Sequence, residues 1–190
     1  GVPSILKFIL QEVSERQQRM LYMQSAIRVH EQHLRPLYDH LVYAARVLDI
    51  VPVPQLYVQQ TPVIQAMAIG VENPFVVLTT GLLDTLDDRQ ILGVIGHELG
   101  HIQAGHQLYR MTLHVLLQAT LGLLGGILPA AALLPIQHAL LYWYRCSELT
   151  CDRAQMLVQR DFDSYVRCEM KLAGGSNYTN ALLDPEQFLA

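Results

Sequence analysis

A short segment near the middle of the chain concentrates groups that can bind a metal ion and move a proton. The segment "GVIGHELGHIQAGH", residues 93–106, contains His-Glu-x-x-His at His97, Glu98 and His101. On a helix, side chains four residues apart project from the same face, so both imidazoles can reach one ion. Glu98 can take a proton from a water molecule on that ion. The pattern therefore predicts a hydrolytic metal site that needs one more protein ligand.

His106 is the nearest further histidine, and its spacing argues against it as that ligand. It lies nine residues after His97, which places it on the opposite face of a continuous helix. Its position also does not fit the pattern HExxHxxGxxH. We therefore expect His106 to face solvent or to cap the helix.

A second polar segment, "YRCSELTCDRAQM" at residues 144–156, is predicted to be a helix. Glu148 and Asp152 lie one turn apart on it. Glu148 can complete a site of two histidines and one glutamate, and Asp152 can accept a hydrogen bond from a ligand histidine. Arg145 shares the same face and can orient the carboxylates. Taken alone, this pattern favours an ordinary charged helix face with salt bridges.

The preceding segments predict the elements that must position these groups. Apolar residues recur at helical spacing over residues 4–34, and Pro36 suits the first turn of a second helix. Thr85 is predicted to cap the helix that carries the two histidines. Between these helices lie three β-like runs, at residues 55–60, 64–70 and 75–81.

The composition limits the class of protein. Of 190 residues, 51% are hydrophobic and 16% charged, which argues against disorder. The net charge of -4 leaves no electrostatic footprint for nucleic acid, so we expect no nucleic-acid partner. The three cysteines lack CxxC spacing and are predicted to be free thiols: Cys146, Cys151 and Cys168.

An apolar stretch separates the two polar segments. Residues 119–136 contain no charge, and Pro129, Pro135 and two glycines predict two short helices with a break. A surface hairpin that touches lipid or another subunit and a buried core element are equally good interpretations. A membrane span is a weaker one, since a span needs about 20 apolar residues.

Together, the two polar segments resemble the HtpX-like zinc metallopeptidases. This gluzincin family includes the CAAX prenyl protease and the mitochondrial inner-membrane Oma-type protease, and it combines HExxH with a downstream motif similar to SRxxExxxD. Arg145, Glu148 and Asp152 match that motif, whereas Tyr144 stands where serine is common. Gln65 replaces an asparagine that the family often has in its strand. The resemblance covers residues 36–190 and includes the strings "PQLYV", "AMAIG", "VVLTTGLLDTL" and "KLAGG".

The resemblance implies a fold and a metal site. It implies an α+β, mainly helical zincin-like (gluzincin) metallopeptidase domain with a small three-stranded sheet next to the HExxH helix. One zinc ion per chain would be held by His97, His101 and Glu148, with Glu98 as the general base. Asp152 and Arg145 would not bind the zinc ion themselves. They would hold the ligand side chains in position.

We divide the chain into an N-terminal helical arm, residues 1–35, and a catalytic domain, residues 36–190. The domain contains the apolar hairpin, residues 111–144, and we expect the natural chain to continue past Ala190. Many family members have transmembrane helices or a hydrophobic hairpin between the zinc motifs. Only 46 residues separate His101 from Glu148, which is room for a short hairpin.

The predicted function is that of a zinc-dependent endopeptidase acting on extended or misfolded, including membrane, protein segments, as in HtpX-like quality control. The substrate is expected to add a β-strand to an exposed sheet edge. Residues 65–70 are the first choice for that edge and residues 75–80 the second. The predicted substrate-binding residues are Gln65, Ala66, Met67 and Ala68.

Two other interpretations stay open at this stage. One is a latent or inactive metallopeptidase-fold adaptor at a membrane, in which residues 4–34 can block the cleft. The other is a helical structural protein whose HExxH is accidental. We expect membrane association, with contact through residues 119–136 and the catalytic domain on the cytoplasmic side. The oligomeric state is not predicted.

Overall fold

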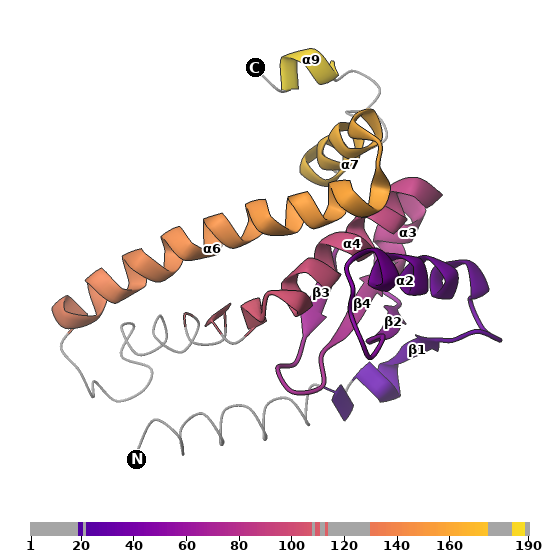
Figure 1. Ribbon diagram of the computed structural model, residues 1–190, viewed down its shortest axis with the longest axis horizontal. Coiled ribbons are helices and arrows are strands. Elements are labelled where there is room, and N and C mark those ends of the chain that lie inside the picture. The colour runs from indigo at the N-terminus through magenta and orange to yellow at the C-terminus, as the bar shows by residue number, and fades with distance from the viewer. Residues whose placement is uncertain are drawn as a thin grey trace.

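Helices gather around a small mixed sheet (Figure 1). The computed structural model describes residues 19–20, 22–107, 109–110, 113, 130–174 and 184–188. The predicted α+β class is confirmed, although the sheet has four strands and not three. In chain order the elements are β1 (Ala26–Val29), α2 (Arg35–Val47), β2 (Gln55–Gln59), β3 (Ala66–Ile69), β4 (Phe75–Thr79), α3 (Thr80–Thr85), α4 (Asp88–Gln103), α6 (Ala130–Gln159), α7 (Phe162–Gly174) and α9 (Pro185–Phe188).

The strands lie in the order β1-β2-β4-β3. The β2 and β4 strands are parallel, and the other two pairs are antiparallel. The predicted helix over residues 4–34 is wrong from Ala26 onward, because residues 26–29 pair with β2 instead. The β-branched Ile27 and Val29 suit a strand, and Val29 is buried there. The division of the chain at residue 35 stays a prediction.

The two faces of the sheet bury different partners. Side chains that alternate along β2 and β4, such as Leu56 and Val76, join the main core with α2, α3, α4 and α6. Tyr57, Phe75 and Val77 point to the other face. Tyr22 packs there against Phe75 with ring centres 5.8 Å apart. The described part of the N-terminal segment therefore lies on the sheet face opposite α4.

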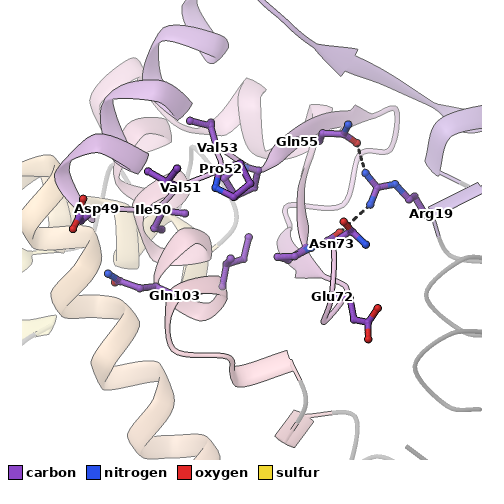
Figure 2. Close-up of a pocket in the computed structure, with 13 residues that line it drawn as sticks. Arg19, Asp49, Ile50, Val51, Pro52, Val53, Gln55, Glu72, Asn73 and Gln103 are labelled. Atoms are coloured by element: carbon purple, nitrogen blue, oxygen red, sulfur yellow. Dashed lines mark hydrogen bonds between the residues drawn. The ribbon is translucent and has the colours of Figure 1, made fainter. Parts of the chain in front are cut away.

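Arg19 fixes this N-terminal segment to the sheet (Figure 2). Its guanidinium donates hydrogen bonds to the Asn73 carbonyl at 2.9 Å and to Gln55 Oε1 at 2.6 Å. The same residues border a cavity of about 470 Å³ between the loop 49–55, the β3–β4 turn and the end of α4. His97 and Glu98 are not among its lining residues, so this cavity is separate from the HExxH motif.

The helix that carries HExxH begins two residues later than the sequence predicted. Thr85 ends α3, whose own cap is the Thr79 hydroxyl. Asp87 caps α4, since its carboxylate accepts from the Gln90 N–H at 3.0 Å. The Gln90 side chain accepts in turn from the Asp87 N–H, which completes a capping box. Only Leu86 and Asp87 separate α3 from α4, so the predicted cap Thr85 lies within one turn of the observed cap.

Small residues allow α4 and α6 to lie very close together. A Cβ added at Gly96 would stand 2.9 Å from Val158 Cβ, and one at Gly100 would stand 2.9 Å from Ala154 Cβ. Real Cβ atoms essentially never approach that closely, so glycine is required at this contact. This contact sets how near the α6 carboxylates come to the α4 histidines.

Changing Gly96 to valine should therefore destabilise the protein by about 1–3 kcal/mol, because the added side chain overpacks the α4–α6 contact. Urea unfolding followed by circular dichroism measures the change. The matched control is the double variant with Val158→Ala, which makes room and should recover part of the loss. Equal stability of Gly96→Val and wild type would contradict this account of the packing.

The α6 helix runs through Pro135 without a break (Figure 1). Pro135 therefore does not interrupt the helix, whereas the part of the predicted break that falls on Pro129 and the two glycines lies outside the described residues. Pro135 lies in the second turn, where the loss of one backbone hydrogen bond leaves the rest of a 30-residue helix intact. The remaining part of the predicted hairpin around residues 119–129 lies outside the described residues. Of the helices that the structure describes, none has the length and apolar content needed to cross a bilayer.

Candidate metal and catalytic site

Two helices bring three metal-binding groups to one point. His97 and His101 come from α4, with ring centres 5.0 Å apart, and Glu148 comes from α6. Glu148 Oε2 lies 3.3 Å from His97 Nε2 and 3.5 Å from His101 Nε2. The two ring nitrogens and the carboxylate oxygen thus face a common centre, as a site of two histidines and one glutamate needs.

Asp152 lies behind the first histidine. Its Oδ1 is 3.2 Å from His97 Nδ1, the ring nitrogen turned away from Glu148. A carboxylate in this position holds the imidazole in the tautomer whose Nε2 lone pair is free. The one-turn spacing of Glu148 and Asp152 thus lets a single helix face supply both groups.

The positive charge of the histidine and the negative charges of the carboxylates at this site stabilise each other. Burial lowers the pKa of His97, but hydrogen bonds to Asp152 and Glu148 outweigh it and raise that pKa to about 10. Burial acts against the Glu148 carboxylate as well, yet hydrogen bonds from His101 and His97 hold its pKa well below the usual range. A metal ion that binds His97 must therefore displace its proton.

The donor set fits a metal ion. Glu148 Oε1 and Glu98 Oε2 are buried and find no hydrogen-bond partner within the described part of the chain. Buried carboxylate oxygens without a donor are costly, which an ion and its water would relieve. Two imidazoles and one carboxylate are also the ligand types of hydrolytic metal sites.

Cys151 is close enough to be considered as a ligand. Its thiol, His97 and His101 offer ligand atoms within 4.8 Å of one another. However, burial and the nearby carboxylates raise the pKa of Cys151 far above its usual range, which makes a thiolate ligand costly to form here. Its sulfur lies 3.5 Å from His106, on the side of His101 away from Glu148. Glu148 is therefore the better third ligand.

The expected place of His106 is wrong. The α4 helix ends at Gln103, and Gly105 takes a left-handed conformation with φ of 65°, so the helix is interrupted before helical residues resume at His106. His106 is buried, and its Nδ1 lies 3.0 Å from His101 Nδ1. The prediction assumed one continuous helix from His97 to His106, whereas Gly105 interrupts that helix. A glycine just past a helix is the sequence signal that was available.

Glu98 is placed to act as a base. It is 7% exposed, and burial raises its pKa while the charges of His97 and His101 oppose that rise. The backbone of Ala68 hydrogen-bonds to its carboxylate, and its Oε2 is without a donor among the described residues. A carboxylate with a raised pKa holds a transferred proton more readily than an exposed one does.

The β3 strand forms the sheet edge next to this glutamate. Only one side of β3 pairs with a strand, namely β4, among the described residues. Gln65 and Ala66 line a cavity of about 280 Å³ together with His97 and Glu98. The side chain of Met67 points to the other sheet face, where its sulfur accepts from the Tyr22 hydroxyl. Met67 can thus serve a substrate only through its backbone.

The predicted role of Arg145 has no support in its position. Arg145 is exposed, whereas the charge of Arg110 acts on Glu98. Arg110 lies over the Tyr144 ring, 5.3 Å from the ring centre. Arg110 was not predicted from the sequence, because its spacing from His101 does not indicate a contact with a residue on α6.

Comparison with known proteins agrees with this geometry. The chain is 34% identical to the plastoglobule-localized metallopeptidase 48, chloroplastic, of Arabidopsis thaliana, over 100% of this chain and 55% of that protein. It is 34% identical to a protease HtpX homolog of Streptococcus pyogenes serotype M3, over 44% of this chain and 28% of the relative. A homolog of the same name from Streptococcus thermophilus is 32% identical over 57% of this chain and 36% of the relative.

The chain thus spans about half the length of the Arabidopsis relative and less of the streptococcal ones. No solved structure matches it. The model of peptidase family M48 matches residues 31–183, which include both polar segments of the candidate site. The resemblance drawn from the sequence is therefore confirmed, and this chain belongs to peptidase family M48.

Proposed function

We propose that this chain is the catalytic domain of a zinc-dependent endopeptidase. The observation that carries the proposal is the convergence of His97, His101 and Glu148 beside a buried Glu98. Two imidazoles and a carboxylate with one open position are a ligand set of catalytic zinc sites. Membership of a metallopeptidase family supports the same choice.

His97 and His101 would hold the zinc ion through Nε2, and Glu148 through its carboxylate. When bound, zinc lowers the pKa of a water molecule and polarises a carbonyl group. Glu98 then accepts the proton of the attacking water and later gives it to the leaving amine. Asp152 keeps the His97 ring in place during these steps, because it holds Nδ1 at 3.2 Å.

The substrate would be an extended polypeptide that adds a strand to β3. The free edge of β3 offers main-chain groups, and the cavity beside it accepts side chains. Main-chain pairing selects flexible or unfolded segments and gives loose side-chain specificity. This mode of binding fits a role in protein quality control.

We place the protein at a membrane, with the catalytic domain on the cytoplasmic side. The support is the apolar stretch 119–136, of which Leu134 is 48% and Ile136 50% exposed. The Arabidopsis relative is named as plastoglobule-localized, and other relatives are named protease HtpX homologs. We propose no nucleic-acid partner, since the net charge is -4.

Metal content and cleavage of an unfolded protein test this function together. Mass spectrometry should find about one zinc per chain. Casein should be cleaved, and a strong chelator should stop cleavage until zinc is added back. Zinc without cleavage would mean a latent or adaptor form, and no zinc even after adding metal would contradict the proposal.

A further inference from the structure

We propose that His106 is a positioning residue that holds the second metal-binding histidine, His101, through its Nδ1. This inference rests on the proposed function, because it assigns a role toward the metal site. In this arrangement each imidazole ligand has its own partner from a different element. His97 has Asp152, and His101 has His106.

The fold places His106 on the far side of His101 from Glu148. Nε2 of His101 lies 3.5 Å from Glu148 Oε2, whereas its Nδ1 lies 3.0 Å from His106 Nδ1. The two ring planes meet at 73° with centres 5.2 Å apart. His106 therefore contacts the ring nitrogen that a metal bound at Nε2 leaves unused.

The protonation states follow from this geometry. A neutral imidazole that offers the Nε2 lone pair to a metal carries its proton on Nδ1. His101 Nδ1 is then a donor, so His106 Nδ1 must be the acceptor and its proton must lie on Nε2. His106 can do this only as a neutral ring.

Packing keeps His106 in this orientation. The His106 side chain is 6% exposed. Its ring packs in a T-shaped arrangement against Trp143 on α6, with ring centres 5.1 Å apart and ring planes at 85°. The Cys151 sulfur lies 3.5 Å from the same Nδ1. The left-handed Gly105 interrupts the helix directly before His106, which frees this ring from the phase of α4. A neutral acceptor thus stands where a carboxylate would add a buried charge.

Neither His106 nor Cys151 takes the place of a ligand in this assignment. The Nδ1 of His106 is directed at His101 and not at the point where Nε2 of both histidines and Glu148 meet. Cys151 contacts that same nitrogen. Both groups therefore lie on the Nδ1 side of His101, away from the metal position. Of the two, only His106 has a ring nitrogen that can accept the Nδ1 proton of His101.

The test compares zinc affinity, by competition with a metallochromic chelator, across three variants of the whole chain. His106→Phe keeps the ring and its contact with Trp143 but removes the acceptor, and zinc should bind about 10–100-fold more weakly. His106→Asn places an amide oxygen near the position of Nδ1, and affinity should stay within a few-fold of wild type. Cys151→Ala should bind zinc as wild type does.

Spectra of the Co2+-substituted proteins give a readout that does not depend on turnover. His106→Asn should keep the ligand-field bands of wild type, and His106→Phe should change them. Wild type should lack a thiolate-to-cobalt charge-transfer band, since Cys151 is not a ligand. If His106→Phe does not fold, His106→Leu takes its place with the same expected loss.

Unchanged affinity in the phenylalanine or leucine variant would overturn the proposal while leaving the zinc site in place. Equal losses in the asparagine and phenylalanine variants would overturn it too, since packing and not the acceptor would then matter. Loss of zinc in Cys151→Ala would make the thiol a ligand. Failure of wild type to bind zinc would instead overturn the proposed function itself.

Discussion

Replacing Glu98 by glutamine should lower the rate of peptide cleavage by about 10²–10⁴-fold while bound zinc stays in place. The amide keeps the shape of the side chain and its contact with the Ala68 backbone, but it cannot take a proton. In the wild-type glutamate, Oε2 is the carboxylate oxygen that has no hydrogen-bond donor among the described residues. The substitution therefore removes the proton acceptor at the atom that we expect to face the reacting water.

Cleavage of casein, or of a quenched fluorogenic peptide, and zinc content should be measured on the same samples. Glu186→Gln is the matched control, because it makes the same chemical change at an exposed glutamate of α9. That variant should cleave as wild type does. Full cleavage by Glu98→Gln would remove the general base from the mechanism, and loss of its zinc would make Glu98 part of the metal site.

Replacing Glu148 by glutamine should empty the site. The carboxylate is the only anionic group within 3.5 Å of both Nε2 atoms among the described residues, and a neutral amide is a far weaker zinc ligand. We expect affinity to fall by more than the roughly 10–100-fold that a supporting residue costs. Cleavage should be lost together with the metal.

The same variant should also lose the stabilisation that zinc gives to the folded state. At a free zinc concentration of 100 times the dissociation constant this amounts to about 2.7 kcal/mol. For a chain of this size it corresponds to a rise in Tm of roughly 5–10 °C on adding zinc. Calorimetry should show this rise for wild type and not for Glu148→Gln. An equal rise in both proteins would assign the third ligand to another residue.

The helix with HExxH and the downstream helix could both be predicted from the sequence, since they depend on local spacing alone. The spacing of four residues in His97 and His101, and again in Glu148 and Asp152, fixes which side chains share a face. That the two faces meet is a tertiary fact. The glycines at 96 and 100 hint at it, because they mark a close helix contact.

The misses have local physical causes. The prediction for His106 is wrong because the left-handed Gly105 interrupts the helix between His101 and His106. The segment 26–29 was assigned to a helix because its apolar residues continue a helical pattern, whereas pairing with β2 decides its structure. Pro135 suggested a break, yet α6 absorbs it. In each case a contact distant in sequence, or a single dihedral angle, outweighs the pattern.

The close contact of α4 and α6 has a consequence for how this domain can change in length. The ligands belong to two helices whose glycine-lined contact sets their separation, so this separation does not depend on the length of the chain between Leu113 and Ala130. The entropy of closing such a connection rises slowly, by about 0.6 kcal/mol for each doubling of its length. Insertions between Leu113 and Ala130 that leave the helix contact and His106 in place should therefore be tolerated. A whole additional domain can be spliced in at this point while the metal site keeps its geometry.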